Sequence, residues 1–169
     1  MPNPAFPYRL REYAPSDAAA LLHLFRDTVR RVNCRDYRPS QIQAWASEEI
    51  ELADWAARFE GHAAYVVEHD RSPVGFADMS PSGYLDRLFV SADHPRRGIA
   101  TMLLNRLLQR AAELGIKRIT TAASITAKPF FLAKGFEVLE QQSVECRGES
   151  LINFKMVYHL TPPPGVRSR

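Results

Sequence analysis

The sequence predicts an α+β fold with a mixed, mostly antiparallel central sheet flanked by helices. Some segments alternate apolar and polar residues as half-buried strands do, and others repeat apolar residues at the spacing of amphipathic helices. Short turns join several of the strands, which makes those neighbours antiparallel. One helix lies between two strands as a β-α-β crossover, and this adds a parallel pair. The predicted order is β-α-α-α-β-β-β-α-β-α-β-β.

The N-terminal half is predicted to hold a strand, three helices and a strand pair. Alternating residues form the first strand, and the sequence A-P-S-D then stops it and caps a helix. The turn D-R-S-P separates the two later strands. In chain order these elements are a strand at Tyr8 to Tyr13, a helix ending near Asn33, a short helix from Pro39, a third helix over about Glu49 to Phe59, and strands at Ala63 to Glu68 and Val74 to Met79.

The elements of the C-terminal half are predicted from the same kinds of sequence pattern. A strand carrying Leu88 and Val90 leads through a glycine turn into an amphipathic helix that ends at Leu114 and Gly115. Lys134 and Gly135 form a C-cap arrangement for the next helix. The remaining elements are a strand at Arg118 to Ala122, a helix at Ala127 to Ala133, and two long strands at Phe136 to Glu145 and Leu151 to Leu160 around an R-G-E-S turn.

The length of 169 residues suits one domain, 1–169, large enough to bury a single core. We expect the ordered core to cover about residues 8–160. The segment 161–169 reads T-P-P-P-G-V-R-S-R and is predicted to be a frayed tail.

Composition excludes several classes of function. The net charge of +3 is a mild bias that is compatible with an anionic small molecule and does not require nucleic acid. Cys34 and Cys146 show neither metal-ligand spacing nor a disulfide framework, so we expect reduced thiols, a cytoplasmic protein and no metal. No stretch approaches membrane-spanning length, and no partnership with a membrane is expected.

The most informative segment runs from Leu85 to Thr101. An apolar strand is followed by a polar turn, two arginines, Gly98 and a helix. A helix that opens on a glycine presents free N–H groups and its positive dipole end, which suits a phosphate or pyrophosphate. Neither a Walker A sequence nor G-x-G-x-x-G is present. The alternative is an ordinary strand-turn-helix with solvated arginines.

A second segment, S-I-T-A-K-P-F-F-L-A-K-G-F from Ser124 to Phe136, follows about thirty residues later. Together the two segments resemble the paired acetyl-CoA-binding motifs of the GNAT N-acetyltransferase superfamily. The run R-R-V-N-C-R-D-Y from Arg30 to Tyr37 is similar to that of small bacterial acetyltransferases of undefined substrate. The resemblance implies acetyl-CoA as co-substrate and direct acetyl transfer to a primary amine of a small molecule or peptide. A homodimer is compatible with it.

The resemblance also implies which residues bind acetyl-CoA. The turn and helix start would hold the pyrophosphate, the splayed strand would pair with the pantetheine arm, and the second motif would line the channel. Two departures stand out: Pro95 has no N–H to donate, and Phe131 replaces the tyrosine that often protonates the leaving thiolate. The implied cofactor residues are Leu88, Phe89, Val90, Arg96, Arg97, Gly98, Ile99, Ala100, Thr101, Ser124 and Phe131.

Asp86 is the leading candidate for the general base that deprotonates the amine. It lies four residues before Val90, which predicts that it shares the face of Val90. The alternative is an ion pair with Arg87 or Arg118. Glu145 is a second candidate, whereas His94 is expected to be a solvated loop residue. Cys146 lacks a supporting histidine, and the main-chain N–H of Leu88 or Phe89 would polarise the carbonyl.

For the acceptor, the family places the pocket between the first helices and the last strands, where Asn33, Asp36 and Tyr37 fall. Asp36 suits a cationic amine and Arg35 an anionic one, so the sequence does not choose. Two other functions remain open. One is a non-catalytic acyl-CoA sensor, and the other is a nucleic-acid-associated protein using Arg96, Arg97, Arg106 and Arg110.

Overall fold

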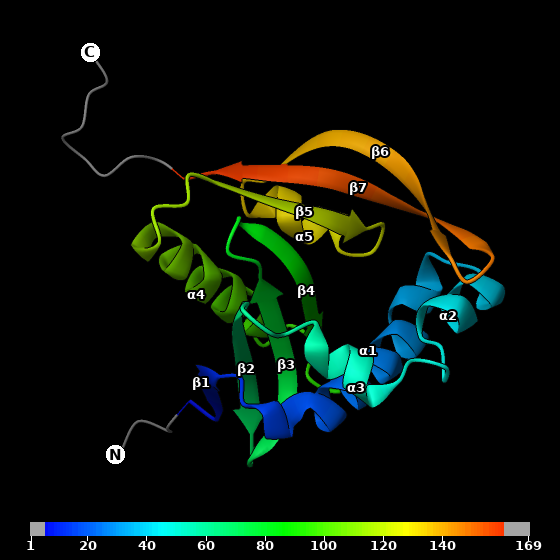
Figure 1. The fold of residues 1–169 in the computed structure, drawn as a ribbon, viewed down its shortest axis with the longest axis horizontal. Coiled ribbons are helices and arrows are strands. Elements are labelled where there is room, and N and C mark those ends of the chain that lie inside the picture. The colour runs from blue at the N-terminus through cyan, green and yellow to red at the C-terminus, as the bar shows by residue number, and fades with distance from the viewer. Residues whose placement is uncertain (1–5, 161–169) are drawn as a thin grey trace.

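A computed structural model describes residues 6–160 of the chain. Its seven strands form one sheet in the order β1-β2-β3-β4-β5-β7-β6 (Figure 1). The strands are β1 (Tyr8–Glu12), β2 (Ala63–His69), β3 (Ser72–Met79), β4 (Tyr84–Val90), β5 (Arg118–Ser124), β6 (Glu137–Cys146) and β7 (Glu149–His159). The helices are α1 (Ala18–Arg31), α2 (Pro39–Trp45), α3 (Leu52–Ala57), α4 (Ile99–Glu113) and α5 (Lys128–Ala133), with short 3-10 turns at Pro15–Asp17 and Asn33–Arg35.

The predicted fold class and the predicted order of elements are confirmed. One helix is shorter than predicted, because α3 begins at Leu52 and not near Glu49. The backbone before it is used in a turn: Glu49 N–H donates to the Ser47 hydroxyl, and Ile50 N–H donates to the Ser47 carbonyl. The predicted tail at 161–169 lies outside the described residues.

Helices cover both faces of the sheet and give the molecule two apolar clusters. The face under α4 buries Leu103, Leu104 and Leu107 against strand residues such as Val67 and Met79. The other face lies under α1, α2 and α3 and is rich in aromatic rings, among them Phe25, Trp55, Phe59 and Phe76. Both α1 and α4 carry their apolar residues at helical spacing, so each helix buries one stripe and leaves the other in solvent.

The sheet divides where its one parallel pair lies. β4 and β5 pair only through Tyr84 with Thr120 and Leu85 with Thr121, whereas β4 pairs with β3 up to Val90. Beyond Leu85 the two parallel strands therefore separate, as Figure 1 shows. The main chain of the second half of β4 is left with a free edge toward β5, and this edge forms the floor of the candidate site.

Candidate active site

A cavity of about 650 Å³ begins at the gap between β4 and β5. Its walls come from β4, β5, the start of α5, the segment after α1 and the end of the β6–β7 hairpin. Of the residues predicted to bind the cofactor, the cavity is lined by Leu88, Phe89, Val90, Ala100, Ser124 and Phe131. Segments far apart in sequence thus meet around one space, large enough for a small-molecule site.

The turn before α4 has the geometry of an anion site. Gly98 has a φ of 77° and Arg96 a φ of 58°, so both residues are left-handed. No other atom lies within 4 Å of where a side chain at Gly98 would begin, and the turn is exposed. The first intrahelical bond of α4 runs from Met102 N–H to the Gly98 carbonyl. The N–H groups of residues 99–101 therefore have no acceptor within the helix and point from its positive end.

The free edge of β4 is held rigidly from its other side. The ring of Phe89 packs edge-on against Phe25, with the ring centres 5.0 Å apart, and stacks on Phe76. The Thr28 hydroxyl donates a hydrogen bond of 3.1 Å to the Val90 carbonyl. The main-chain groups of Phe89 face β3, so pairing along the free edge falls to Leu88 and to Val90 N–H.

The second motif packs around α5 in two ways. The Ser124 hydroxyl accepts a bond of 3.0 Å from Ala127 N–H and so fixes the turn that begins α5. The Phe131 ring is only 3% exposed and lies 4.9 Å from Phe136, yet it also borders the cavity beside Phe130. Phe131 therefore serves both the core and the channel wall, and its ring has no proton to donate.

Asp86 borders the cavity, but it does not share the face of Val90. A register shift between Asp78 and Met79 breaks the alternation of the strand pair at this point. Both Asp86 carboxylate oxygens lie 3.1 Å from Nη2 of Arg58, at the end of α3. Val90 instead packs on the α4 side of the sheet. The expected ion pair with Arg87 is present at 3.9 Å, but Arg58, which the sequence did not predict as a partner, lies closer at 3.1 Å.

A buried ion pair lies directly behind Asp86. Asp78 is fully buried and accepts two hydrogen bonds from Arg87, of 3.0 and 2.8 Å, and its Oδ2 lies 2.8 Å from His62 Nδ1. The Arg87 guanidinium also stacks over Phe59 at 4.0 Å. One donor atom each of His62, Asp78 and Asp86 falls within 4.8 Å of the others. Both carboxylates already face an arginine, so this cluster is arranged for ion pairing.

The predicted acceptor residues separate into different roles. Asn33 is buried beside the cavity, with its Nδ2 at 3.5 Å from the Ser124 hydroxyl. The Tyr37 hydroxyl donates to the Ile152 carbonyl at 2.6 Å and accepts from Ile125 N–H at 3.0 Å. Burial raises the pKa of Tyr37. Tyr37 therefore borders the cavity as a link between the loop after α1 and strands β5 and β7.

Asp36 does not line the cavity itself, but it contacts Thr126, which does. Its carboxylate accepts a bond of 2.8 Å from the Thr126 hydroxyl in an exposed contact. The 3-10 turn at Asn33–Arg35 turns successive side chains to different sides, so Asn33 faces inward while Asp36 faces the β5–α5 loop. Arg35, the alternative for an anionic acceptor, is also absent from the lining.

His94 is not the solvated loop residue that the sequence predicts. Its Nδ1 lies 3.0 Å from the Tyr8 hydroxyl, and its ring packs against Tyr8 and His69. The N-terminal strand brings Tyr8 across the turn, a contact between residues 86 positions apart.

Glu145 is exposed at the cavity rim and accepts a bond of 2.6 Å from the Ser150 hydroxyl. Cys146 directs its thiol at the Ala44 carbonyl at 3.5 Å.

Sequence reasoning missed three residues that shape the cavity: Thr28, Arg58 and Asn153. Thr28 and Arg58 contact residues that are far away in the sequence, so no local pattern indicates that they line the cavity. Asn153 interrupts an apolar strand between Ile152 and Phe154, which is a visible signal. Its Oδ1 is buried and has no hydrogen-bond partner among residues 6–160. A buried acceptor without a partner is costly, so this oxygen is suited to a ligand N–H.

Comparison with known proteins places the fold and the family. Residues 33–158 match the family model described as the acetyltransferase (GNAT) domain. The uncharacterized N-acetyltransferase YafP of Escherichia coli K12 is 39% identical over 150 residues, which cover 89% of this chain and 95% of the relative.

Solved structures of N-acetyltransferases have the same fold as this chain. A GCN5-related N-acetyltransferase from Rhodopseudomonas palustris superposes with a TM-score of 0.86 and 32% identity, covering 90% of this chain and 95% of that one. PaiA N-acetyltransferase from Thermoplasma acidophilum, solved with coenzyme A, has the same fold with a TM-score of 0.72 and 16% identity. Its match covers 90% of this chain and 99% of that one.

Proposed function

This chain belongs to the GNAT family and is an acetyl-CoA-dependent N-acetyltransferase, and from that premise we propose which residues bind acetyl-CoA and which acceptor is used. The acceptor is a primary amine of a small molecule or peptide that enters the cavity from the side of Asn33 and the β6–β7 hairpin. The observation that carries this proposal is the continuity of the cavity. One cavity is lined both by residues of the β4/β5 gap and by the segment after α1.

The residues present fit acetyl-CoA. The free N–H groups of residues 99–101, opening on Gly98, hold the pyrophosphate, and Arg96 and Arg97 add exposed positive charge beside it. The free edge of β4 at residues 88–90 pairs with the amide-bearing pantetheine arm as an added strand would. Ser124 and Phe131 border the far wall of the gap, and Phe131 supplies apolar surface.

Acetyl-CoA supplies the activated acetyl group as a thioester. The amine nitrogen attacks the carbonyl carbon, the C–S bond breaks, and the amine proton must leave. Asp86 takes this proton, directly or through one water, because it is the carboxylate on the strand that lines the cavity beside the pantetheine edge. The N–H of Leu88 stabilises the developing oxyanion, because Phe89 N–H faces β3 and Leu88 N–H faces the gap. Phe131 cannot protonate the departing thiolate, so that step falls to water or another group.

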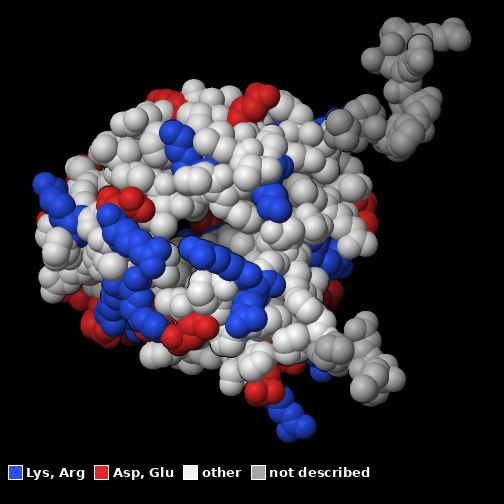
Figure 2. Space-filling model, turned by 180° about the vertical axis from the view of Figure 1, so that it is seen from behind, with Lys and Arg blue, Asp and Glu red and all other residues white. Residues whose placement is uncertain are grey.

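The non-catalytic sensor is favoured by no observation beyond the phenylalanine at position 131. The four arginines named for nucleic-acid binding do not lie together on the structure. Arg96 and Arg97 lie at the start of α4, whereas Arg106 and Arg110 lie in its second half beside a different pocket. In Figure 2 several basic side chains gather beside a hollow on one part of the face shown, and acidic side chains lie next to them.

We also propose a homodimer through the free edge of β6. Among the strands at residues 6–160, β6 pairs with β7 alone, and Val138 and Leu139 are 39% and 59% exposed along it. An exposed apolar edge strand favours pairing with a second copy. Light scattering of Leu139→Arg against the parent chain tests this, because a dimer built on that edge becomes a monomer.

We propose that the protein is cytoplasmic, because its two free cysteines fit a reducing compartment. No helix among residues 6–160 combines the length and apolar character needed to cross a bilayer.

The test of the proposed function is a broad screen of primary amines with CoA release as the readout, beside calorimetric titration with acetyl-CoA. The proposal expects acetyl-CoA binding without an amine and amine-dependent release of CoA. Binding without release for every amine class would favour the sensor. Absence of acetyl-CoA binding would contradict the assignment of the cofactor residues.

A further inference from the structure

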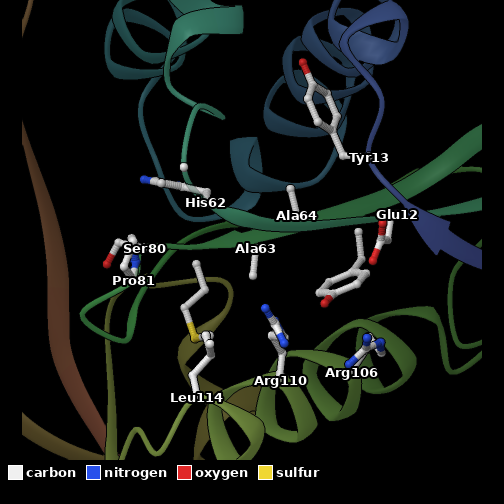
Figure 3. Close-up of a pocket in the computed structure, with 13 residues that line it drawn as sticks. Glu12, Tyr13, His62, Ala63, Ala64, Ser80, Pro81, Arg106, Arg110 and Leu114 are labelled. Carbon is white, nitrogen blue, oxygen red and sulfur yellow. The ribbon is translucent and has the colours of Figure 1, made fainter.

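A second pocket of about 490 Å³ lies beside the C-terminal half of α4. It is enclosed by α4 on one side and by β1, β2 and β3 on the other (Figure 3). None of its lining residues borders the candidate active site. The pocket is therefore a separate feature of the molecule, and acetyl transfer as described above makes no use of it.

Two arginines of α4 project into this pocket. Arg106 and Arg110 are four residues apart, so they lie on the same face of the helix and both line the pocket, and Figure 3 shows Arg110 extending from the helix toward the sheet. Two like charges at this spacing repel each other. Glu12 is the acidic residue of the lining, and no ion pair within 4.0 Å joins it to either arginine. The lining therefore holds two guanidinium groups and one carboxylate, and Arg106 has no carboxylate partner among residues 6–160.

Arg106 is the less explained of the two arginines. Its guanidinium lies 4.5 Å from the centre of the Tyr65 ring, and it forms no hydrogen bond or ion pair with any residue from 6 to 160. Its Nη1 is buried without a partner. By contrast, Arg110 reaches Glu113 through Nη1 at 3.0 Å. A buried guanidinium nitrogen without a partner costs free energy, and a ligand oxygen in the pocket would complete it.

The helix dipole does not explain this pair. Cations are favoured in the last turn of a helix, and Arg110 lies there. Arg106 lies seven residues before Glu113, beyond the reach of that effect.

The walls of the pocket also suit a small organic molecule: Met79 and Leu114 give apolar surface, and the Ser80 hydroxyl gives a polar contact (Figure 3).

We propose that this pocket binds a small molecule bearing an oxyanion, a carboxylate or a phosphate, through Arg106 and Arg110. The planar fork of a guanidinium matches both groups and pairs with them through two parallel hydrogen bonds. The Tyr65 ring holds Arg106 in place from one side, so the side chain is oriented before the ligand arrives.

The test is calorimetric titration of the full chain with two probes, inorganic phosphate and succinate, in separate arms. Saturating CoA is present in both arms, so that the turn at Gly98 is filled. Binding of phosphate alone assigns a phosphate site, binding of succinate alone assigns a carboxylate site, and binding of both assigns a general oxyanion site. Neither probe binding up to about 10 mM, a concentration well above the dissociation constant of even a weak site, would overturn the proposal.

Variants locate the site. Arg106→Gln and Arg110→Gln should each weaken binding of the probe at least about tenfold, since each removes a charge-assisted contact. Arg106→Lys should recover only part of the loss, because the ammonium keeps the charge and lacks the fork. Arg118→Gln, which removes an exposed arginine of β5, is the matched control and should leave binding unchanged. Thermal midpoints confirm that each variant is folded. Equal binding by the parent chain and both glutamine variants would place the anion elsewhere and refute the assignment.

Discussion

Replacing Gly98 by alanine separates the strain of the turn from its role in binding acetyl-CoA. Gly98 has a φ of 77°, and a new Cβ there would have no atom within 4 Å. The substitution therefore creates no clash within the protein, and its cost to folding comes from the left-handed backbone alone. In the complex the same methyl group would stand between the main chain and the pyrophosphate.

Both effects have an expected size. An alanine held in the left-handed region costs about 1–2 kcal/mol, which lowers the thermal midpoint of a domain of this size by about 2–4 °C per kcal/mol. Displacing the pyrophosphate loses at least one hydrogen bond to a charged group, worth roughly 1.5–3 kcal/mol. We therefore expect Gly98→Ala to weaken acetyl-CoA binding by about tenfold to a hundredfold.

Gly115 is a matched control at the opposite end of α4. Its φ is 72°, and a Cβ there also meets nothing within 4 Å. Gly115→Ala should lower the thermal midpoint by a similar amount and leave acetyl-CoA affinity unchanged in calorimetric titration. Equal affinity losses in the two variants would show that strain in α4, and not access to the main chain, weakens binding. Unchanged affinity in Gly98→Ala would refute the pyrophosphate assignment.

Three further outcomes are expected. Phe131→Tyr should keep acetyl-CoA affinity; if thiolate protonation limits turnover, kcat should rise by at most ~10²-fold, and otherwise it should stay within a few-fold. Asp86→Asn should lower kcat while acetyl-CoA still binds; full turnover by Asp86→Asn at every pH would exclude Asp86 as the base. Asp17→Asn should lower the free energy of unfolding at pH 7 by about 2 kcal/mol, because hydrogen bonds from Arg11 lower the pKa of Asp17. That stabilisation is present above the unfolded-state pKa of about 4 and is lost as pH falls through the lower folded-state pKa, so denaturant curves of the two proteins should converge in acid.

The sequence predicts the fold well because each element carries a local signal. The apolar stripe of α4, the glycine turns and the alternation of the strands all act over a few residues. The phosphate-binding turn belongs to the same class, because Gly98 and the helix start that it precedes are adjacent in the chain. Local chemistry of this kind can be read without knowing the tertiary structure.

The catalytic and acceptor ends were less predictable because they depend on contacts across the fold. Strand alternation placed Asp86 on the wrong face, since the register shift with β3 arises from pairing between strands. The partner of Asp86 is Arg58, 28 residues away, and the carboxylate of Asp36 is used by Thr126, 90 residues away. Residue type alone cannot distinguish a side chain that lines a cavity from one that fastens two loops.

Hydrogen exchange of the full chain with and without acetyl-CoA tests the central claim most directly. The account predicts slower exchange of the N–H groups of residues 99–101 and of Leu88 and Val90 when acetyl-CoA is bound, because these groups are free at the turn and along the β4 edge, whereas Phe89 N–H faces β3. Amides at the C-terminal end of α4 should be unaffected. Protection that is absent from both the turn and the β4 edge, while acetyl-CoA still binds, would contradict the account.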